Sequence, residues 1–243
     1  MVIFPMLRNN TNLKVADRIV FEDNHLIVVN KLAGELVQGD FTGDKPLVEL
    51  VRDYIRDTYN KPGNVFCGLV HRLDRPTSGM VIFAKTSKAL TRMNKLFETR
   101  SLEKRYYAVL AQRPPEEITV LEHWLRKDGT KNKSFVVKAD TANAKKARLE
   151  YQLVATSQKY FLAEVNLLTG RHHQIRAQLS KEGNPIKGDL KYGYPRSNHD
   201  ASISLHAGKI SFEHPVSNEM LNLKAVCLGE DAIWRVFNTY ISE

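Results

Sequence analysis

Four segments in the second half of the chain have the composition of β-strands and follow one another without a helix between them. They cover residues 118–122, 134–138, 147–155 and 160–168. Strands joined by short turns pair antiparallel, because a parallel pair needs a long crossover connection. This run therefore favours a sheet of largely antiparallel strands over an alternating strand and helix arrangement.

The rest of the chain adds further strands and a few helices. Residues 19–31 predict a hairpin with its turn at Asp23 and Asn24, and more strands are expected near 66–71 and 79–85, from Lys104, and within 202–215. Helices are expected with Asp44 near the N-cap of the first, after Ser87 as N-cap, within 171–182, and over 231–241. Because no linker, repeat or low-complexity tract interrupts this order, residues 1–243 predict a single α+β domain.

The charge of the chain points to a polyanionic partner. Lysine and arginine number 36 against 27 aspartate and glutamate, which gives a net charge of +9. Such an excess is typical of proteins that bind nucleic acid or an anionic membrane surface. The basic residues gather in three runs, Lys85–Arg105, Trp124–Arg148 and Arg171–Arg196, which could converge into a groove for a phosphate backbone.

The cysteines and the first residues bear on location. Cys67 and Cys227 each follow apolar residues, so we expect buried thiols in a reducing compartment and no zinc site or disulfide framework. The apolar stretch MVIFPML at residues 1–7 is too short to span a bilayer and lacks the features of a secretory signal. We therefore expect a cytoplasmic protein without membrane attachment, and by default a monomer.

A charged turn separates the strands expected at 66–71 and 79–85, and Asp74 is its central residue. Asp74 could cap a turn, bind a metal, act as a general base or act as a nucleophile. A metal site needs several carboxylates and histidines close together, and His71 is the only such neighbour. A reactive carboxylate must be ionised, which a nearby arginine favours. The candidates for that arginine are Arg72, Arg75, Arg171 and Arg176.

A second polar cluster lies in the segment GRHHQIR, at residues 170–176. On a helix, His172 and Arg176 are one turn apart, as are Gln174 and Gln178. Several polar groups then share one face of the helix. This pattern indicates either a binding face or an exposed polar helix, and the spacing does not separate the two.

The strand that begins at Lys104 carries adjacent tyrosines, Tyr106 and Tyr107. Side chains alternate across a strand, so only one of the two can face a given pocket. A tyrosine facing a pocket can stack on a flat base, whereas a tyrosine in the core packs against neighbouring strands.

These segments together resemble the RluA-like family of pseudouridine synthases. The matching motifs are VHRLDRPTSG at 70–79, KRY at 104–106, TGRHHQIR at 169–176 followed by GDLKYG, and LHA with FEHP at 205–215. The match extends from about residue 19 to about residue 216. It implies the pseudouridine synthase fold, a central mixed and mainly antiparallel sheet with flanking helices and an active-site cleft. It also implies conversion of uridine in RNA to its carbon-linked isomer, without metal or cofactor.

The resemblance also implies roles for individual residues. Asp74 matches the essential aspartate, Tyr106 the active-site tyrosine, and Arg176 the arginine that pairs with the aspartate. Arg72 matches the residue that enters the RNA helix and helps to displace the target base. Other polar residues in or beside the matching motifs are expected to contact RNA: His71, Arg75, Arg171, His173 and Gln174.

The sequence departs from the family pattern at Leu32, where proline is frequent, and at Gln178, where histidine is common. Many members also carry an N-terminal S4-type RNA-binding module. The first expected strand here begins at residue 19, so we expect no separate module and a tRNA or ribosomal RNA substrate bound by the catalytic domain. Two alternatives remain: a catalytically inactive RNA-binding protein of the same fold, and a metal-dependent nuclease.

Overall fold

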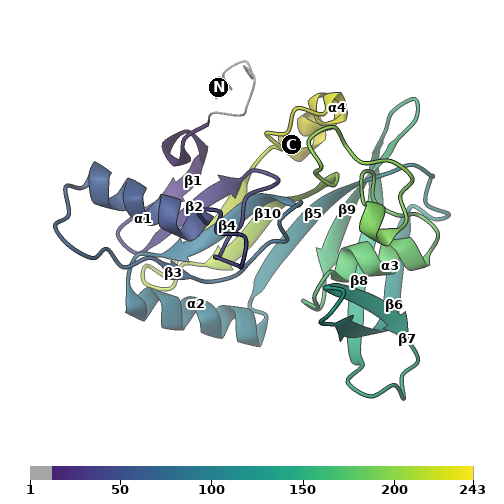
Figure 1. Cartoon of the computed structure of the whole chain (residues 1–243), viewed down its shortest axis with the longest axis horizontal. Helices are drawn as coiled ribbons and strands as arrows, with labels where there is room; N and C mark the ends of the chain where they lie inside the picture. Colours follow the sequence, from purple (N-terminus) through teal and green to yellow (C-terminus); the bar gives the residue numbers. More distant parts are fainter. Residues whose placement is uncertain (1–12, 243) are drawn as a thin grey trace.

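The computed structural model describes residues 13–242, whose strands form one continuous sheet (Figure 1). Its order is β1-β2-β4-β10-β5-β9-β8-β6-β7, with β3 paired to β4 and β11 paired to β10. The strands are β1 Ile19–Glu22, β2 Leu26–Lys31, β3 Gly68–Leu69, β4 Ser78–Ala84, β5 Leu102–Leu110, β6 Ile118–Asp128, β7 Lys133–Val137, β8 Lys145–Thr156, β9 Phe161–Leu167, β10 Leu205–Glu213 and β11 Met220–Lys224. The segment at residues 1–7 lies outside the described residues.

The sheet is mixed and mainly antiparallel, as predicted. Within the described residues, the β4–β10 pair is parallel and the other pairs between these strands are antiparallel. The predicted run of strands in the second half is confirmed as β6, β7, β8 and β9. In β8 the alternating residues Ala147, Leu149 and Tyr151 are buried, which is the pattern of a strand with one face on the core.

Strand β10 joins the two halves of the sheet, since it lies between β4 and β5 (Figure 1). Its parallel contact with β4 is short, pairing His206 with Ser78 and Ala207 with Gly79. Gly79 has a φ of +120°, and a Cβ added there would lie 2.4 Å from the backbone N and O of Ala207. Only glycine therefore fits at this junction without moving one of the two strands.

We expect Gly79→Ala to destabilise the fold by about 3 kcal/mol or more, because it combines an unfavourable φ with a backbone clash. Gly63→Ala is the matched control, since Gly63 also has a positive φ of +76° but no atom within 4 Å of the added Cβ. That control should cost only the conformational term, about 1–2 kcal/mol. Denaturant unfolding of both variants measures the difference, and equal losses would contradict a tight β4–β10 junction.

The helices cover both faces of the sheet. On one face, α1 (Leu47–Thr58) and α3 (Gln174–Lys181) pack on a core that includes Tyr106. On the other face lie α2 (Ser87–Thr99) and α4 (Ala232–Ser242), the latter packed near Tyr107. Short 3-10 helices η2 (Val15–Arg18) and η3 (Leu190–Tyr192) complete the elements. The two tyrosines of β5 thus point to opposite faces.

The structure confirms a helix start near Asp44 and corrects the N-cap predicted at Ser87. Helix α1 has Pro46 at its N-cap position, without a side-chain cap, and Asp44 instead pairs with Arg75. Helix α2 is capped by Thr86, whose Oγ1 accepts from the backbone N–H of Ala89 at 3.1 Å, and Ser87 is its first residue. Strand β11 was not predicted. Among residues 13–242, no helix combines the length and apolar composition that crossing a bilayer requires.

Candidate active site

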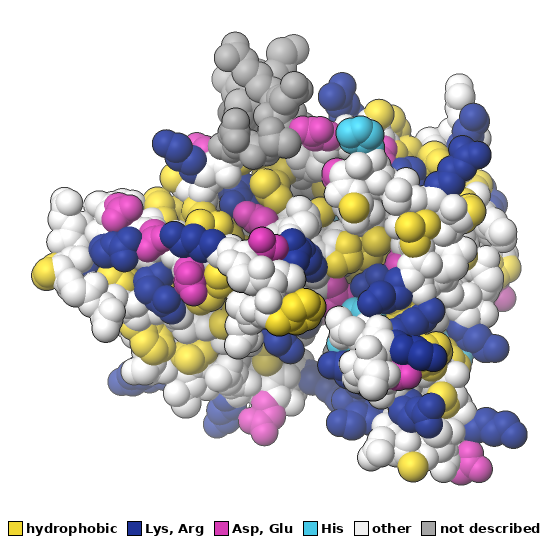
Figure 2. Space-filling view, viewed as in Figure 1, with side chains coloured by type: hydrophobic (Ala, Val, Ile, Leu, Met, Phe, Trp, Pro, Cys, Tyr) yellow, Lys and Arg dark blue, Asp and Glu magenta, His cyan; other side chains and the backbone are white. Residues whose placement is uncertain are grey.

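A cleft of about 350 Å³ opens on the sheet face that carries α1 and α3. Segments far apart in the sequence line it: the β3–β4 turn, β5, and the turn that leads into α3. Figure 2 shows a hollow near the middle of the molecule with lysine and arginine side chains on both sides. The polar lining residues of the cleft include Arg72, Asp74, Thr77, Lys104, Tyr106, Arg171, His172, His173, Gln174 and Arg176.

Asp74 lies in the β3–β4 turn with its carboxylate facing the cleft. The backbone oxygen of Asp74 accepts from the N–H of Thr77 at 3.0 Å, which closes the turn. Its Oδ2 accepts a hydrogen bond from Arg176 Nη1 at 3.2 Å and lies 3.4 Å from His173 Nε2. The side chain is 31 % exposed, so the carboxylate is partly desolvated and still open to a ligand. The arginine that contacts Asp74 is therefore Arg176, which is the partner that the resemblance implied.

A second aspartate, which the sequence reasoning missed, orients Arg176. Asp189 accepts from Arg176 Nε at 2.7 Å and from Nη2 at 2.8 Å, in a bidentate pair that leaves Nη1 directed at Asp74. Asp189 is 1 % exposed. Burial lowers the pKa of Arg176, but the Asp189 and Asp74 carboxylates outweigh this, so the pKa is raised overall. The GDLKYG motif contains Asp189, and its place in a glycine-rich loop suggested only a turn.

Tyr106 forms one wall of the cleft from β5. Burial raises its pKa well above the ordinary range, and the negative charge of Asp74 raises it further. The phenol therefore stays protonated at neutral pH. Tyr107 faces the opposite side of the sheet, where its hydroxyl donates to Glu164 Oε2 at 2.7 Å. The geometry selects Tyr106 as the tyrosine that faces the cleft.

His172 and His173 stack on each other beside the cleft, with ring centroids 3.8 Å apart. Burial, reinforced by Arg176, lowers the pKa of His173 to about 2, so the ring is neutral. Its Nδ1 lies 3.0 Å from the Tyr192 hydroxyl. Nδ1 of His172 lies 2.9 Å from Ser134 Oγ, on the first part of β7. Both rings line the cleft, and the neutral His173 ring offers no positive charge to a phosphate.

Three other polar residues that line the cleft differ in how firmly hydrogen bonds within the protein hold them. Arg72 is exposed, and its nearest recorded partner is Gln38 Oε1 at 3.5 Å. Arg171 donates from Nε to the Lys146 carbonyl at 3.0 Å. Gln174 accepts from the N–H of Arg171 at 2.9 Å and from Thr169 Oγ1 at 2.8 Å, so it supports the turn and has little capacity left for RNA.

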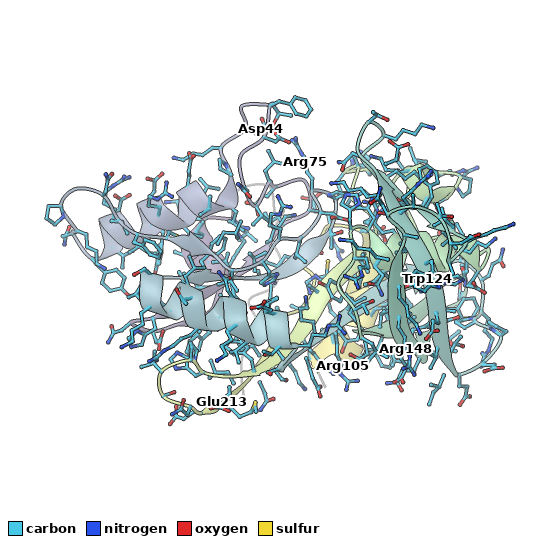
Figure 3. All side chains as sticks on the ribbon, turned by 90° about the horizontal axis from the view of Figure 1, so that it is seen from below. Asp44, Arg75, Arg105, Trp124, Arg148 and Glu213 are labelled. Atoms are coloured by element: carbon cyan, nitrogen blue, oxygen red, sulfur yellow. The ribbon has the colours of Figure 1, made fainter. Side chains whose placement is uncertain are left out.

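Two residues expected to contact RNA, His71 and Arg75, do not line the cleft. His71 accepts from the N–H of Ile82 at 3.3 Å and stacks on Phe97, and burial lowers its pKa to about 3. It is a neutral, half-buried histidine that packs between β4 and α2. Arg75 pairs with Asp44 Oδ2 at 2.6 Å. Figure 3 labels these two residues close together.

A fully buried lysine supports the turn that carries Asp74. Lys31, at the end of β2, donates from Nζ to the carbonyls of Leu32, Arg75 and Thr77 at 2.9, 3.1 and 2.6 Å. Two of these acceptors follow Asp74 within three residues in the sequence. The ammonium group therefore fixes the backbone that presents the carboxylate.

Stability should depend on the titration of Lys31. Burial lowers its pKa to about 7, although Glu35 and Asp74 act in the opposite direction, while the ordinary value is 10.5. Between these values the folded state binds fewer protons than the unfolded state, so the free energy of unfolding should increase with pH. Denaturant unfolding of the wild type and Lys31→Met should give a stability difference that grows across this range. A constant difference would contradict a depressed lysine pKa.

Within residues 13–242, no group of three or more histidine, cysteine, aspartate and glutamate side chains is arranged to hold a metal ion. The charged groups of the cleft instead form an Asp74–Arg176–Asp189 chain with Tyr106 opposite. This arrangement offers an oriented carboxylate, a fixed cation and an aromatic ring in one concave site.

The fold is that of pseudouridylate synthases. The structure of human RNA Pseudouridylate Synthase Domain Containing 4 matches with a TM-score of 0.75 at 23 % identity, covering 93 % of this chain and 94 % of that chain. Human RNA Pseudouridylate Synthase Domain Containing 1 matches with a TM-score of 0.68 over 86 % of this chain and 82 % of that chain, also at 23 % identity.

The sequence comparisons identify the family. The family model described as RNA pseudouridylate synthase matches residues 25–181. A tRNA pseudouridine synthase C from Vibrio cholerae is 32 % identical, covering 89 % of this chain and 92 % of the relative. A ribosomal large subunit pseudouridine synthase D from Zymomonas mobilis is 31 % identical, covering 91 % of this chain and 72 % of the relative. The chain belongs to the RNA pseudouridylate synthase family, and it is an isomerase that converts uridine to pseudouridine.

Proposed function

We propose that this protein isomerises specific uridines in folded tRNA or ribosomal RNA, with Asp74 as the essential catalytic group. The observation that carries the proposal is the Asp74 carboxylate, held at 3.2 Å by Arg176 in a cleft that Tyr106 also lines. The names of the two relatives include one tRNA enzyme and one ribosomal enzyme, and both substrates have the polyanionic backbone that a net charge of +9 favours.

The reaction needs an ionised, positioned carboxylate. The bond between uridine N1 and C1′ breaks, a bond between C5 and C1′ forms, the C5 proton leaves to solvent, and N1 gains a proton. Asp74 can serve by attacking C1′, by attacking C6, or by removing a sugar proton. Arg176, fixed by Asp189, would hold the carboxylate in place through each of these routes, and Tyr106 would stack on the detached base.

The position of Asp74 within the cleft requires the target nucleotide to leave its helical stack. Flipping a base costs a few kcal/mol, which is least in a loop or at a mismatch. Arg72 stands exposed on the cleft lining with one long contact, to Gln38 at 3.5 Å, and in this proposal its guanidinium gives up that contact to fill the vacated space. Arg171 and the neighbouring basic residues would hold the flanking phosphates. In this proposal a cytoplasmic monomer acts through this single catalytic domain, without a cofactor.

The decisive experiment measures release of tritium from RNA labelled at uridine C5. Bulk RNA from cells that lack this protein is incubated with the purified enzyme in EDTA, after separation into tRNA and ribosomal fractions. Release from one fraction, with the RNA still full length, is the expected result and identifies the substrate. Release only with divalent metal, together with shortened RNA, would favour a nuclease instead. Tight binding of both fractions without release would favour an RNA-binding protein that has lost catalysis.

A further inference from the structure

Phe41 is a large hydrophobic side chain left almost entirely in solvent, at 99 % exposure. It lies in the loop of residues 38–44, between β2 and α1. An apolar ring of this size normally gains free energy by packing against the protein. A single exposed apolar side chain is common on a protein surface, so what distinguishes Phe41 is its position beside the cleft.

The 38–44 loop is held by polar contacts that leave the ring outside. Asp40 Oδ1 accepts from the N–H of Thr42 at 2.8 Å and from Thr42 Oγ1 at 2.5 Å, which forms a tight turn around Phe41. Asp44 at the end of the loop accepts from Arg75 at 2.6 Å. Phe41 is thus presented by a loop with its own internal order, which reduces the entropy lost when a partner binds.

Residues at both ends of the 38–44 loop contact the turn that carries Asp74. Gln38 lies 3.5 Å from Arg72 Nη1, and Arg72 lines the cleft together with Asp74. Arg75, the next residue after Asp74, donates from Nε to the Gly34 carbonyl at 3.0 Å and accepts from the Gly34 N–H at 2.8 Å. Gln38 and Asp44 therefore connect the loop to the turn that carries Asp74. Phe41 lies three residues along the chain from each of them.

We propose that Phe41 stacks on an unpaired RNA base next to the target uridine. The inference rests on the proposed function, because it takes RNA as the substrate. Single-stranded and looped RNA is recognised largely by stacking of splayed bases on aromatic side chains. Arg72, whose contact is to the neutral Gln38, can reach an adjoining phosphate, whereas Arg75 and Lys45 are paired with Asp44 and Asp53. Because the loop adjoins the cleft that would hold the RNA, an unpaired base of that RNA is the partner within reach of the ring.

The test separates binding from turnover. The ligand is the RNA fraction from which the wild-type enzyme releases tritium. Its binding is measured to Asp74→Asn protein, which cannot turn over. This protein carries either Phe41 or Ala, Leu, Tyr or Trp at that position. Should no fraction release tritium, unfractionated tRNA is the probe. Phe41→Ala should weaken binding about 10-fold, Tyr and Trp should restore it, and Leu should not. With active enzyme, Phe41→Ala should raise KM and leave kcat unchanged.

Abasic substitution of each nucleotide around the target completes the test. One abasic position should weaken binding by the protein with Phe41 and have no further effect on Phe41→Ala, because the two changes remove the same contact. Phe66→Ala, at a 44 % exposed ring that does not line the cleft, is the control and should bind as the parent does. Unchanged binding by Phe41→Ala, or full rescue by leucine, would overturn the inference. If Phe41→Ala loses binding but the wild-type enzyme releases no tritium, the proposed reaction is refuted and the inference about Phe41 stands.

Discussion

Replacing Asp74 with asparagine should lower the rate of tritium release at least about 10⁴-fold, while the fold and RNA binding are retained. Asparagine has the same shape and its oxygen can still accept from Arg176, so the turn is expected to stay closed. The amide is neutral and is neither a competent nucleophile nor a base at this site. The large loss therefore isolates the chemical role of the carboxylate.

Asp57→Asn is the control for this substitution, since that carboxylate is 74 % exposed on α1 and lies outside the cleft lining. It should react at the wild-type rate. Mass spectrometry of the Asp74→Asn protein excludes deamidation back to aspartate. A variant that is confirmed as asparagine and still reacts at the wild-type rate would refute the assignment of Asp74.

Arg176→Ala should lower both stability and activity, and the structure separates the two losses. The aspartate most affected is Asp189, at 1 % exposure, rather than the more exposed Asp74. Removing one partner of a buried ion pair costs about 3–5 kcal/mol, because the remaining charge is left without compensation. Calorimetry or denaturant unfolding should show a loss of this size.

The double variant Arg176→Ala with Asp189→Asn tests that division. It should recover much of the lost stability, because no uncompensated charge remains beside the removed arginine. It should not recover activity, since Asp74 still lacks its partner. Recovery of both properties together, or of neither, would contradict separate roles for the two contacts of Arg176.

The sequence predicted the elements of this fold better than their arrangement. Alternation of apolar residues identifies strands such as β8, because each strand carries its own pattern. The parallel pairing of β4 with β10 depends on residues 128 positions apart, such as Ser78 and His206, and no local pattern encodes it. Asp44 shows the same limit, since its ion pair with Arg75 was decided by tertiary structure and not by helix capping.

The site was predictable where a motif concentrates unusual residues. Asp74 stood out because a charged turn interrupts two apolar strands, and Arg176 was selected by the family resemblance. Asp189 was missed because an aspartate in a glycine-rich loop usually serves a turn. His71 was expected to contact RNA as a polar residue of the matching motif, but its ring packs against Ile82 and Phe97 and does not line the cleft.

The central place of β10 has a consequence for how the protein is made. A ribosome synthesises β1 to β9 before β10, yet β10 is the strand that joins the half carrying Asp74 to the half carrying Arg176. The nascent chain therefore cannot assemble a competent site until residues 205–213 have left the exit tunnel. Contacts of such long sequence separation also slow folding. The newly made enzyme should thus acquire its activity only after β10 has been synthesised and has paired with both β4 and β5.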